Sequence, residues 1–243
     1  MSSVIEQLRD DKQYYAGVGK NYLSNSDIGT LLKNPKEYGM PREDNKNFLL
    51  GRYFHQLILE PEKAEAMPHI DVASRNTKAY KEFCADNGLD IAMLTKERAD
   101  VDTWVDTIKS NMDFFDAINE NGNTFEEPAI GKLFGEMWKG KADIVGNNFV
   151  YDLKTTSSID DFKWNSRKYN YDSQAYIYEQ LFGKPMVFLV IDKTNLMMGK
   201  FIVSEESLER GKEKVKQAVE IYNRFFGENP TADINQFYYE AEI

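Results

Sequence analysis

The stretch KGKADIVGNNFVYDLKTT, residues 139–156, decides the fold that we expect. Two apolar runs flank the Gly-Asn-Asn triplet at 146–148, and Gly and Asn tolerate the positive φ that tight hairpin turns need. If the two asparagines form the turn, the residues on either side of them pair, and Asp143 falls opposite Asp152. Opposed carboxylates repel each other, and a cation with several oxygen ligands relieves that repulsion. The stretch therefore predicts a β-hairpin that carries a metal site.

The second strand of this hairpin alternates in polarity. Phe149, Tyr151 and Leu153 form an apolar set, so Asp152 and Lys154 share the opposite face. An ammonium group beside metal-binding carboxylates can orient a water molecule or stabilise charge on a phosphate. An Asp and a Lys two positions apart also fit an ordinary solvated strand face, and a register shift of one residue would separate the two aspartates.

Composition and charge limit the class of protein. The chain has 243 residues, a single cysteine and a formal net charge of −10. One cysteine excludes an internal disulfide framework, and no apolar run reaches the ~20 residues that span a bilayer. The first residues are too charged for a signal peptide, so we expect a cytoplasmic protein without membrane attachment. The acidic balance argues against nucleic-acid binding over the whole surface, although a local basic lining is sufficient for one site.

The pattern along the chain predicts one domain with two flanking segments. Residues 1–22 are polar and are expected to be flexible, and residues 227–243 form an acidic, aromatic tail. The region 23–226 between them is expected to be a single domain. Its first part, 23–120, is mainly helical, and its second part, 121–226, holds the sheet core.

Two helices are expected in the mainly helical part. One runs from Asn47 to Leu59, with His55 at the edge of its apolar stripe. The other runs from about Thr95 to Ile118, and residues at helical spacing along it, Met112 and Phe115 among them, are most simply core. A lone histidine such as His55 fits a boundary residue with satisfied hydrogen bonds as well as a ligand.

Three motifs occur in the order found in one nuclease superfamily. Asp143, followed nine positions later by Asp152-Leu153-Lys154, resembles the signature of the PD-(D/E)xK nucleases. FLLGRYFHQLILEP, residues 48–61, is similar to the G-x-x-x-H helix of RecB-like nucleases, and more closely to the exodeoxyribonuclease VIII (RecE-type) branch of phage exonucleases. QAYIY, residues 174–178, resembles the Q-x-x-x-Y motif that follows D-x-K in these nucleases.

The resemblance implies an α/β fold and a metal-dependent DNA exonuclease. The fold would be a restriction-endonuclease-like core, a central mixed β-sheet flanked by helices, with an N-terminal helical region. The activity would be hydrolysis of phosphodiester bonds of double-stranded DNA from its ends, in recombination or repair. A single-strand annealing protein would be a partner. RecE-like exonucleases form rings around DNA, so we expect a homo-oligomeric ring, a trimer or a tetramer.

The same resemblance implies roles for the residues of the motifs. A Mg²⁺ or Mn²⁺ ion would bind Asp143, Asp152, the carbonyl of Leu153, and His55. Three further side chains would orient the water or position the site and the strand: Lys154, Gln174 and Tyr178.

One acidic position near the metal site is open to two interpretations. Glu127 matches an acidic residue that lies near or joins the metal site in the related nucleases. Its neighbour Glu126 competes with it, and strand alternation lets only one of the two point inward. We expect Glu127. His69 lies in no matching motif and is expected to be structural.

Basic side chains that could contact phosphate are scattered along the chain. Six are candidates for DNA binding: Arg75, Lys78, Lys139, Lys141, Lys163 and Arg167. For the segment that contains Arg75 and Lys78, a solvated helix face is as good an interpretation.

Two other functions remain open from the sequence. A structure-specific endonuclease on the same core would share every motif, because dependence on ends comes from the shape of the channel. A non-catalytic DNA-end-binding recombination partner would keep the fold without turnover, and the intact Asp-Asp-Lys set argues against it.

Overall fold

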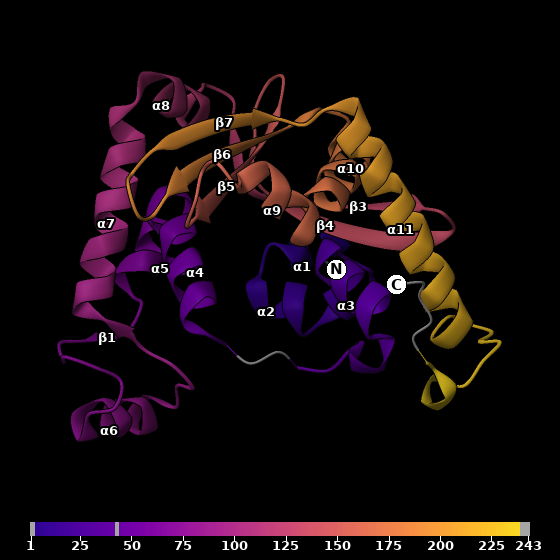
Figure 1. Cartoon of the computed structure of the whole chain (residues 1–243), viewed down its shortest axis with the longest axis horizontal. Helices are drawn as coiled ribbons and strands as arrows, with labels where there is room; N and C mark the ends of the chain where they lie inside the picture. The colour runs from indigo at the N-terminus through magenta and orange to yellow at the C-terminus, as the bar shows by residue number, and fades with distance from the viewer. Residues whose placement is uncertain (1–2, 42–43, 239–243) are drawn as a thin grey trace.

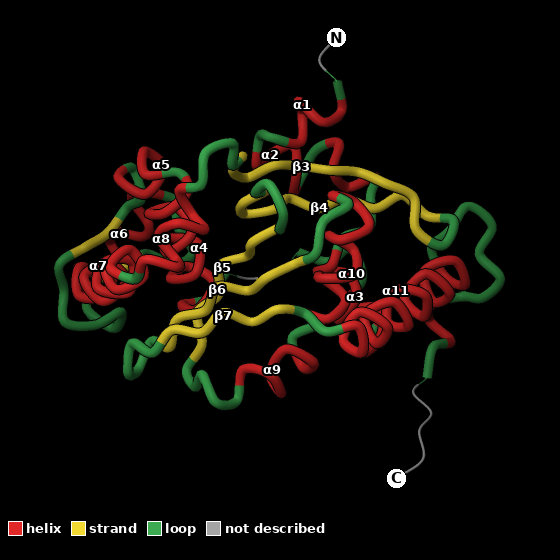
Figure 2. The backbone as a smooth tube through the Cα atoms, turned by 90° about the horizontal axis from the view of Figure 1, so that it is seen from above, coloured by secondary structure: helices red, strands yellow, loops and turns green. Residues whose placement is uncertain are grey.

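A five-stranded mixed β-sheet forms the centre of the protein (Figures 1 and 2), in a computed structural model that describes residues 3–41 and 44–238. The strands lie in chain order, and all neighbours are antiparallel except β5 and β6, which are parallel. Their bounds are β3 Thr124–Leu133, β4 Glu136–Val145, β5 Val150–Thr156, β6 Met186–Asp192 and β7 Met198–Ile202. The architecture is the expected α/β fold with a mixed sheet flanked by helices.

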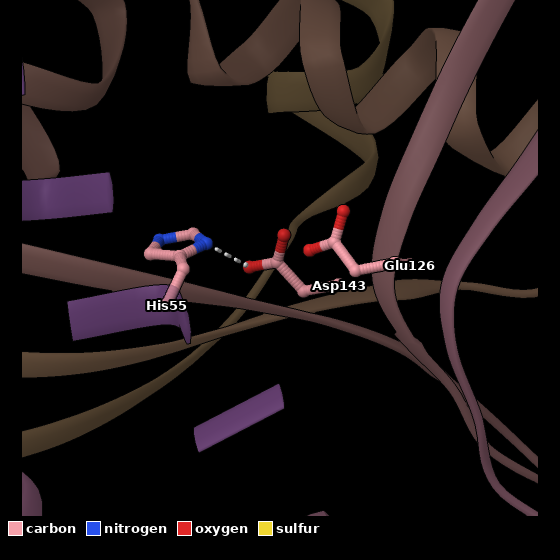
Figure 3. Close-up of side chains that lie close together, drawn as sticks. All are labelled: His55, Glu126 and Asp143. Atoms are coloured by element: carbon pink, nitrogen blue, oxygen red, sulfur yellow. Dashed lines mark ion pairs between the residues drawn. The ribbon is translucent and has the colours of Figure 1, made fainter. Parts of the chain in front are cut away.

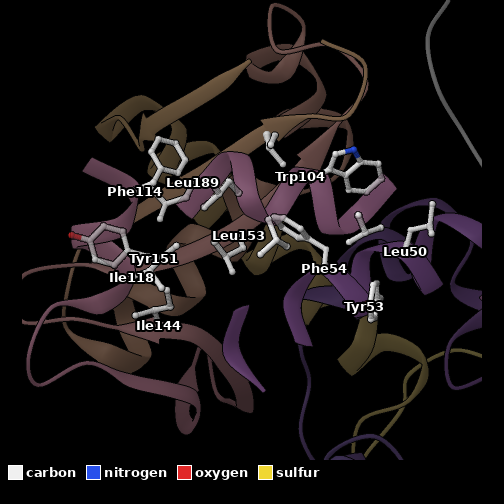
Figure 4. Close-up of a cluster of buried hydrophobic side chains, with 14 of the residues drawn as sticks. Leu50, Tyr53, Phe54, Trp104, Phe114, Ile118, Ile144, Tyr151, Leu153 and Leu189 are labelled. Atoms are coloured by element: carbon white, nitrogen blue, oxygen red, sulfur yellow. The ribbon is translucent and has the colours of Figure 1, made fainter. Parts of the chain in front are cut away.

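Helices cover both faces of the sheet, which explains why β6 is buried along its whole length. One face packs against α4 (Lys46–Leu59), α7 (Thr95–Ser110) and α8 (Met112–Asn119). Figure 4 shows this core, where Phe54 and Trp104 lie near Leu153 and Leu189 of the sheet. The other face packs against α3 (Asn25–Lys33), α10 (Tyr171–Phe182) and α11 (Glu205–Phe225).

Smaller elements complete the described chain. A lobe around α6 has its own small core of Tyr80, Cys84, Ala92 and Leu94, beside a short parallel pair of strands. The remaining bounds are η1 Val18–Asn21, η2 Pro35–Glu37, α5 Pro61–Glu65, β1 His69–Ile70, α6 Lys78–Asn87, β2 Met93–Leu94, α9 Phe162–Lys168 and η3 Ile234–Gln236. In the part of the chain that is described, no helix is both long and apolar enough to cross a bilayer.

The N-terminal segment differs from the flexible one that we expected. It forms α1 (Val4–Leu8) and α2 (Asp11–Tyr15), whose first turns are capped by the side chains of Ser3 and Asp10. Leu8 is fully buried and Tyr14 nearly so. Two capped helices with buried apolar residues lie against the sheet, so this segment forms part of the folded domain.

The hairpin between β4 and β5 has the expected register near its turn. Val145 pairs with Val150 and Ile144 with Tyr151. The Gly146 N–H donates across the turn to the Phe149 carbonyl at 2.9 Å. Regular pairing stops before the two aspartates. The N–H of Leu153 donates instead to Asp143 Oδ2 at 2.7 Å, so the strands diverge where the site begins.

The long helix expected at 95–118 is divided into α7 and α8 at Asn111. The Asn111 side chain accepts a hydrogen bond from the Phe114 N–H and caps the second helix. The break rotates the apolar stripe, so Met112 and Phe115 are exposed by 72% and 44%, whereas Phe114 and Ile118 are buried.

The C-terminal tail returns to its own domain as far as it is described. The ring of Phe237 lies 6.0 Å from that of Phe225 on α11, in an edge-on arrangement. Tyr239 lies outside the described residues.

Candidate active site

An open cleft of about 770 Å³ lies where α4, β4, β5, α10 and the N-terminal segment meet. Its walls include most residues of the three sequence motifs: His55, Asp143, Asp152, Leu153, Lys154, Gln174 and Tyr178. The divergence of β4 and β5 opens the floor of this cleft. Residues far apart in sequence thus meet at one polar surface.

Three potential metal ligands gather at one point in the cleft (Figure 3). One atom each from His55, Glu126 and Asp143 can be chosen so that all three lie within 4.8 Å of one another. His55 Nδ1 lies 3.3 Å from Asp143 Oδ2, and α4 directs the imidazole over the diverging strands. Two carboxylates and an imidazole at this spacing suit a divalent cation, which takes oxygen and nitrogen ligands.

The structure corrects the choice between the two neighbouring glutamates. Glu126 has a φ of +48°, which is uncommon for a residue other than glycine. Pairing of β3 with β4 is regular at Phe125 and Glu127 and is interrupted at Glu126, which the register places opposite Asp143. Glu127 points elsewhere, and its Oε1 accepts a 2.7 Å hydrogen bond from Arg9 Nη2. Glu126 therefore replaces Glu127 as the candidate ligand.

Asp152 and Lys154 form a second polar group beside the first. Lys154 Nζ lies 2.5 Å from Asp152 Oδ2, and Gln174 Nε2 donates to Asp152 Oδ1 at 2.5 Å. Asp152 is only 2% exposed, because α10 covers that face of the sheet. The side chains around it are largely apolar, so Asp152 is a buried charged group. The Lys154 ammonium also lies 5.0 Å from the centre of the Tyr171 ring.

Burial and close charges shift the pKa values of the site in opposite directions. Burial, with Asp143 next to it, raises the pKa of Glu126 to about 8. Burial alone would raise that of Asp143 too, but His55 and Lys154 hold its pKa below the ordinary value. Burial and Asp143 together raise the pKa of Asp152.

The two cationic partners have raised pKa values. Burial alone would lower the pKa of Lys154, but Asp152 raises it, so the side chain remains an ammonium at neutral pH. Burial would likewise lower the pKa of His55, and Asp143 raises it. The protein thus compensates the charge of Glu126 less than that of Asp143, as expected where a cation supplies the missing charge.

Tyr178 acts on the backbone rather than on the charged side chains. Its hydroxyl donates to the Lys141 carbonyl at 2.9 Å and lies 3.3 Å from the Lys141 N–H. The tyrosine therefore attaches α10 to β4, two residues before Asp143. Gln174, one turn earlier on the same helix, reaches Asp152 on β5. The Q-x-x-x-Y motif thus holds the two diverging strands from one helix.

Two of the lysines expected to contact phosphate bind other residues of the protein instead. Lys139 Nζ donates to the Tyr14 carbonyl at 2.5 Å and lies 4.3 Å from the centre of the Tyr14 ring. Lys141 Nζ lies 2.6 Å from Asp11 Oδ1. Both lysine side chains are buried, and burial lowers the pKa of Lys139. The N-terminal segment therefore takes up these two lysines, which corrects the prediction that they meet DNA directly.

The other four basic candidates lie at two places. Arg75 binds Glu97 through two 2.7 Å hydrogen bonds and supports the α6 lobe, and its contact with DNA stays a prediction. Lys78 is exposed on α6, outside the lining of the cleft. Lys163 and Arg167 are on α9, on either side of an exposed Trp164.

Several cleft residues had not been recognised from the sequence, among them Asp11, Tyr14 and Tyr171, which contact predicted site residues. Asp11 and Tyr14 belong to a segment that is polar in sequence, where only the adjacent tyrosines suggested a buried contact. Tyr171 lies three residues before Gln174, so helical spacing would have placed it on the same face of α10.

The sheet topology and the Asp-Asp-Lys group define a PDDEXK-like protein, the class to which the motifs pointed. The family described as "PDDEXK-like domain of unknown function (DUF3799)" matches residues 26–230, and the chain belongs to this family. A comparison with curated proteins found no match.

Two solved structures are similar to this chain, and the first of them has the same fold. A candidate exonuclease from Eubacterium rectale is 18% identical, over 88% of this chain and 86% of that chain, with a TM-score of 0.63. A phage-related exonuclease from Haemophilus somnus is 13% identical, over 90% and 91% of the two chains, with a TM-score of 0.41. Family, fold and site together support a nuclease.

Proposed function

We propose that this protein is a metal-dependent deoxyribonuclease that degrades double-stranded DNA from its ends. One observation carries the proposal. The His55, Glu126 and Asp143 group lies beside the Asp152–Lys154 ion pair in a single open cleft. Carboxylates crowded in this way, with an ammonium next to them, fit the handling of a cation and a phosphate together.

The residues present fit a hard divalent cation, Mg²⁺ or Mn²⁺. His55, Glu126, Asp143 and Asp152 would hold it, with the Leu153 carbonyl as a further ligand. A bound ion of this kind lowers the pKa of a water molecule and neutralises charge on the phosphate. The raised pKa of Glu126 supports the assignment, because a cation removes the cost of keeping that side chain ionised.

The protein's own residues would prepare the site for an attacking water. Lys154 remains an ammonium, so it acts as a hydrogen-bond donor and a positive charge, and not as a general base. Gln174 fixes the orientation of Asp152 through its amide. Tyr178 holds β4 against α10 and so keeps the carboxylates of the two strands at their separation.

The biological setting follows from the resemblance to RecE-type exonucleases. We propose a role in recombination or repair, with a single-strand annealing protein as partner. A ring of three or four chains would gather the sparse basic residues, Lys163 and Arg167 among them, around one channel. With a net charge of −10, a single chain would hold a polyanion weakly at physiological salt.

Incubation with linear and closed circular duplex DNA, with and without Mg²⁺, tests the proposal. We expect linear DNA to be lost in Mg²⁺ and the circle to persist. Cleavage of the circle would support the endonuclease on the same fold. Binding of ends without hydrolysis in either Mg²⁺ or Mn²⁺ would support the non-catalytic end-binding module and refute the proposed activity.

A further inference from the structure

The short helix α9 presents large aromatic side chains to solvent. Trp164 is 58% exposed and Tyr169, just after the helix, is 54% exposed. The other two tryptophans, Trp104 and Trp138, are buried by contrast. Figure 2 shows α9 beyond β7, at the edge of the molecule. The contact of α9 with the hydrophobic core is made by Phe162, so packing of the core does not require the exposed indole of Trp164.

Basic side chains surround the exposed indole. Lys163 Nζ lies 5.1 Å and the Arg167 guanidinium carbon 5.5 Å from the centre of the Trp164 ring. Lys168 stands in the same relation to Tyr169, at 5.5 Å. We call these five residues the α9 platform. Its three cations are a local excess in a chain with a net charge of −10.

The charges of the α9 platform are only weakly compensated. The Arg167 Nη2 atom lies 3.9 Å from Glu206 Oε1, and both side chains are about half exposed or more. Ion pairs of this length at the surface stabilise little. Asp160 and Asp161 precede the helix, whereas the three basic residues all lie within it. The platform can therefore attract an anionic ligand.

The α9 platform is joined to the active site through Tyr171. The Tyr171 ring lies 5.0 Å from Lys154 Nζ and 6.0 Å from the ring of Tyr169. Tyr171 lines the active-site cleft and also a second cavity of about 330 Å³, which Lys163, Trp164 and Arg167 line as well. The helix itself connects β5, which carries the Asp-x-Lys residues, to α10, which carries Gln174. A DNA strand that left the cleft past Tyr171 would therefore lie next to the α9 platform.

We propose that the α9 platform binds unpaired nucleotides of a DNA end, with a base stacked on Trp164 and the flanking phosphates near its cations. The inference rests on the proposed function and adds the state of the substrate. An indole can stack only on a nucleobase whose face is not covered by another base. A single strand offers such a face at every nucleotide, and a duplex offers one only at its last base pair. Cations beside aromatic rings are the recurring composition of surfaces that bind single strands.

The fluorescence of Trp164 tests this binding without hydrolysis. In EDTA, we expect an oligothymidylate, or a duplex with a single-stranded overhang, to quench the emission of the protein, because the other two tryptophans are buried. A blunt duplex closed by a hairpin should quench much less. Equal quenching by the blunt duplex, or no quenching by any of the three DNAs, would overturn the proposal.

Substitutions on the α9 platform give a second readout. With a labelled oligothymidylate, anisotropy should show Trp164→Ala binding roughly 5- to 150-fold more weakly, the loss of one base stack, while Trp164→Phe keeps most of the affinity. Phe115→Ala removes an exposed aromatic residue from α8 and should bind as the wild type does. Unchanged binding by Trp164→Ala would overturn the platform.

The outcomes separate the platform from the proposed function. An active nuclease whose Trp164→Ala variant binds single strands normally refutes the platform alone. Stacking on Trp164 in a protein that hydrolyses no DNA in Mg²⁺ or Mn²⁺ refutes the nuclease and leaves the single-strand site in place. Equal melting temperatures for the wild type and both Trp164 variants would show that the comparison reports on binding.

Discussion

Replacing Glu126 with glutamine should stabilise the metal-free protein, and the gain should depend on pH. Burial and Asp143 raise the pKa of Glu126 from an ordinary 4.5 to about 8. Between these values the folded chain holds a proton that the unfolded chain has lost. The stability of the wild type therefore falls as pH rises from 4.5 to 8, and a glutamine at this position escapes the loss.

The size of the effect follows from the shift. At pH 7 Glu126 is ionised in the unfolded chain and protonated in the folded chain, and this difference lowers the free energy of unfolding by about 3 kcal/mol. A quarter of its side chain is exposed, so solvent screening reduces our expectation to about 2 kcal/mol. For a chain of this length that corresponds to a melting temperature roughly 4–8 °C higher for Glu126→Gln. At pH 5 the difference should fall below about 1 kcal/mol.

Thermal unfolding in EDTA, followed by circular dichroism from pH 5 to pH 8, measures this difference. Glu127→Gln is the matched control, since it removes only the partly exposed ion pair with Arg9, which is worth about 0.2–1 kcal/mol. We expect the control to be slightly less stable than the wild type, without the rise toward pH 8. If Glu126→Gln and wild type show parallel stability curves, the crowding of charge at this site is refuted.

Further outcomes are expected for the catalytic residues, the metal ion, the two histidines and the assembly. Asp152→Asn and Lys154→Ala should each lower the DNA hydrolysis rate at least about 100-fold while circular dichroism stays unchanged, and near wild-type cleavage by either variant would contradict the site. Millimolar Mg²⁺ or Mn²⁺ should raise the melting temperature. The free energy of unfolding should increase by about 2.7 kcal/mol when the ion is at about 100 times its Kd. Asp143→Ala should weaken that gain, and a gain of full size in this variant would remove Asp143 from the metal site. His55→Ala should lose far more activity than His69→Ala, because His69 lies outside the cleft beside Arg98; equal activities would make His55 structural. Light scattering should give the mass of three or four chains, and the mass of one chain with and without DNA would rule out the ring.

Short-range patterns were enough to predict the hairpin, because a two-residue turn sets the pairing of its nearest neighbours. The same reasoning brought Asp143 and Asp152 to one place. The pattern did not predict that the two strands diverge at the aspartates. The divergence occurs because the Leu153 N–H donates to the Asp143 carboxylate and not to a backbone carbonyl of β4. His55 and Lys154 both stabilise the charge of Asp143, and the local pattern contains Lys154 but not His55, which comes from a distant helix.

The choice between Glu126 and Glu127 shows what alternation along a strand leaves open. The rule assigns the two neighbours to opposite faces, as the structure has them, but it does not say which face holds the site. The register of β3 against β4 decides that, because it places Glu126 opposite Asp143, and a single strand does not contain this information. The break at Asn111 was visible in principle, because asparagine is a common N-cap, but the apolar periodicity on both sides concealed it.

The cleft wall provided by α2 has a consequence for how the protein is assembled during synthesis. Asp11 leaves the ribosome 130 residues before Lys141, its ion-pair partner, and Tyr14 precedes Lys139 by 125. Closing so long a loop is entropically costly until the sheet exists to receive it. The residues of α2 are made before the sheet and are thus among the last to dock. A fragment trimmed to 26–230 would leave both lysines without the acceptors that now satisfy them.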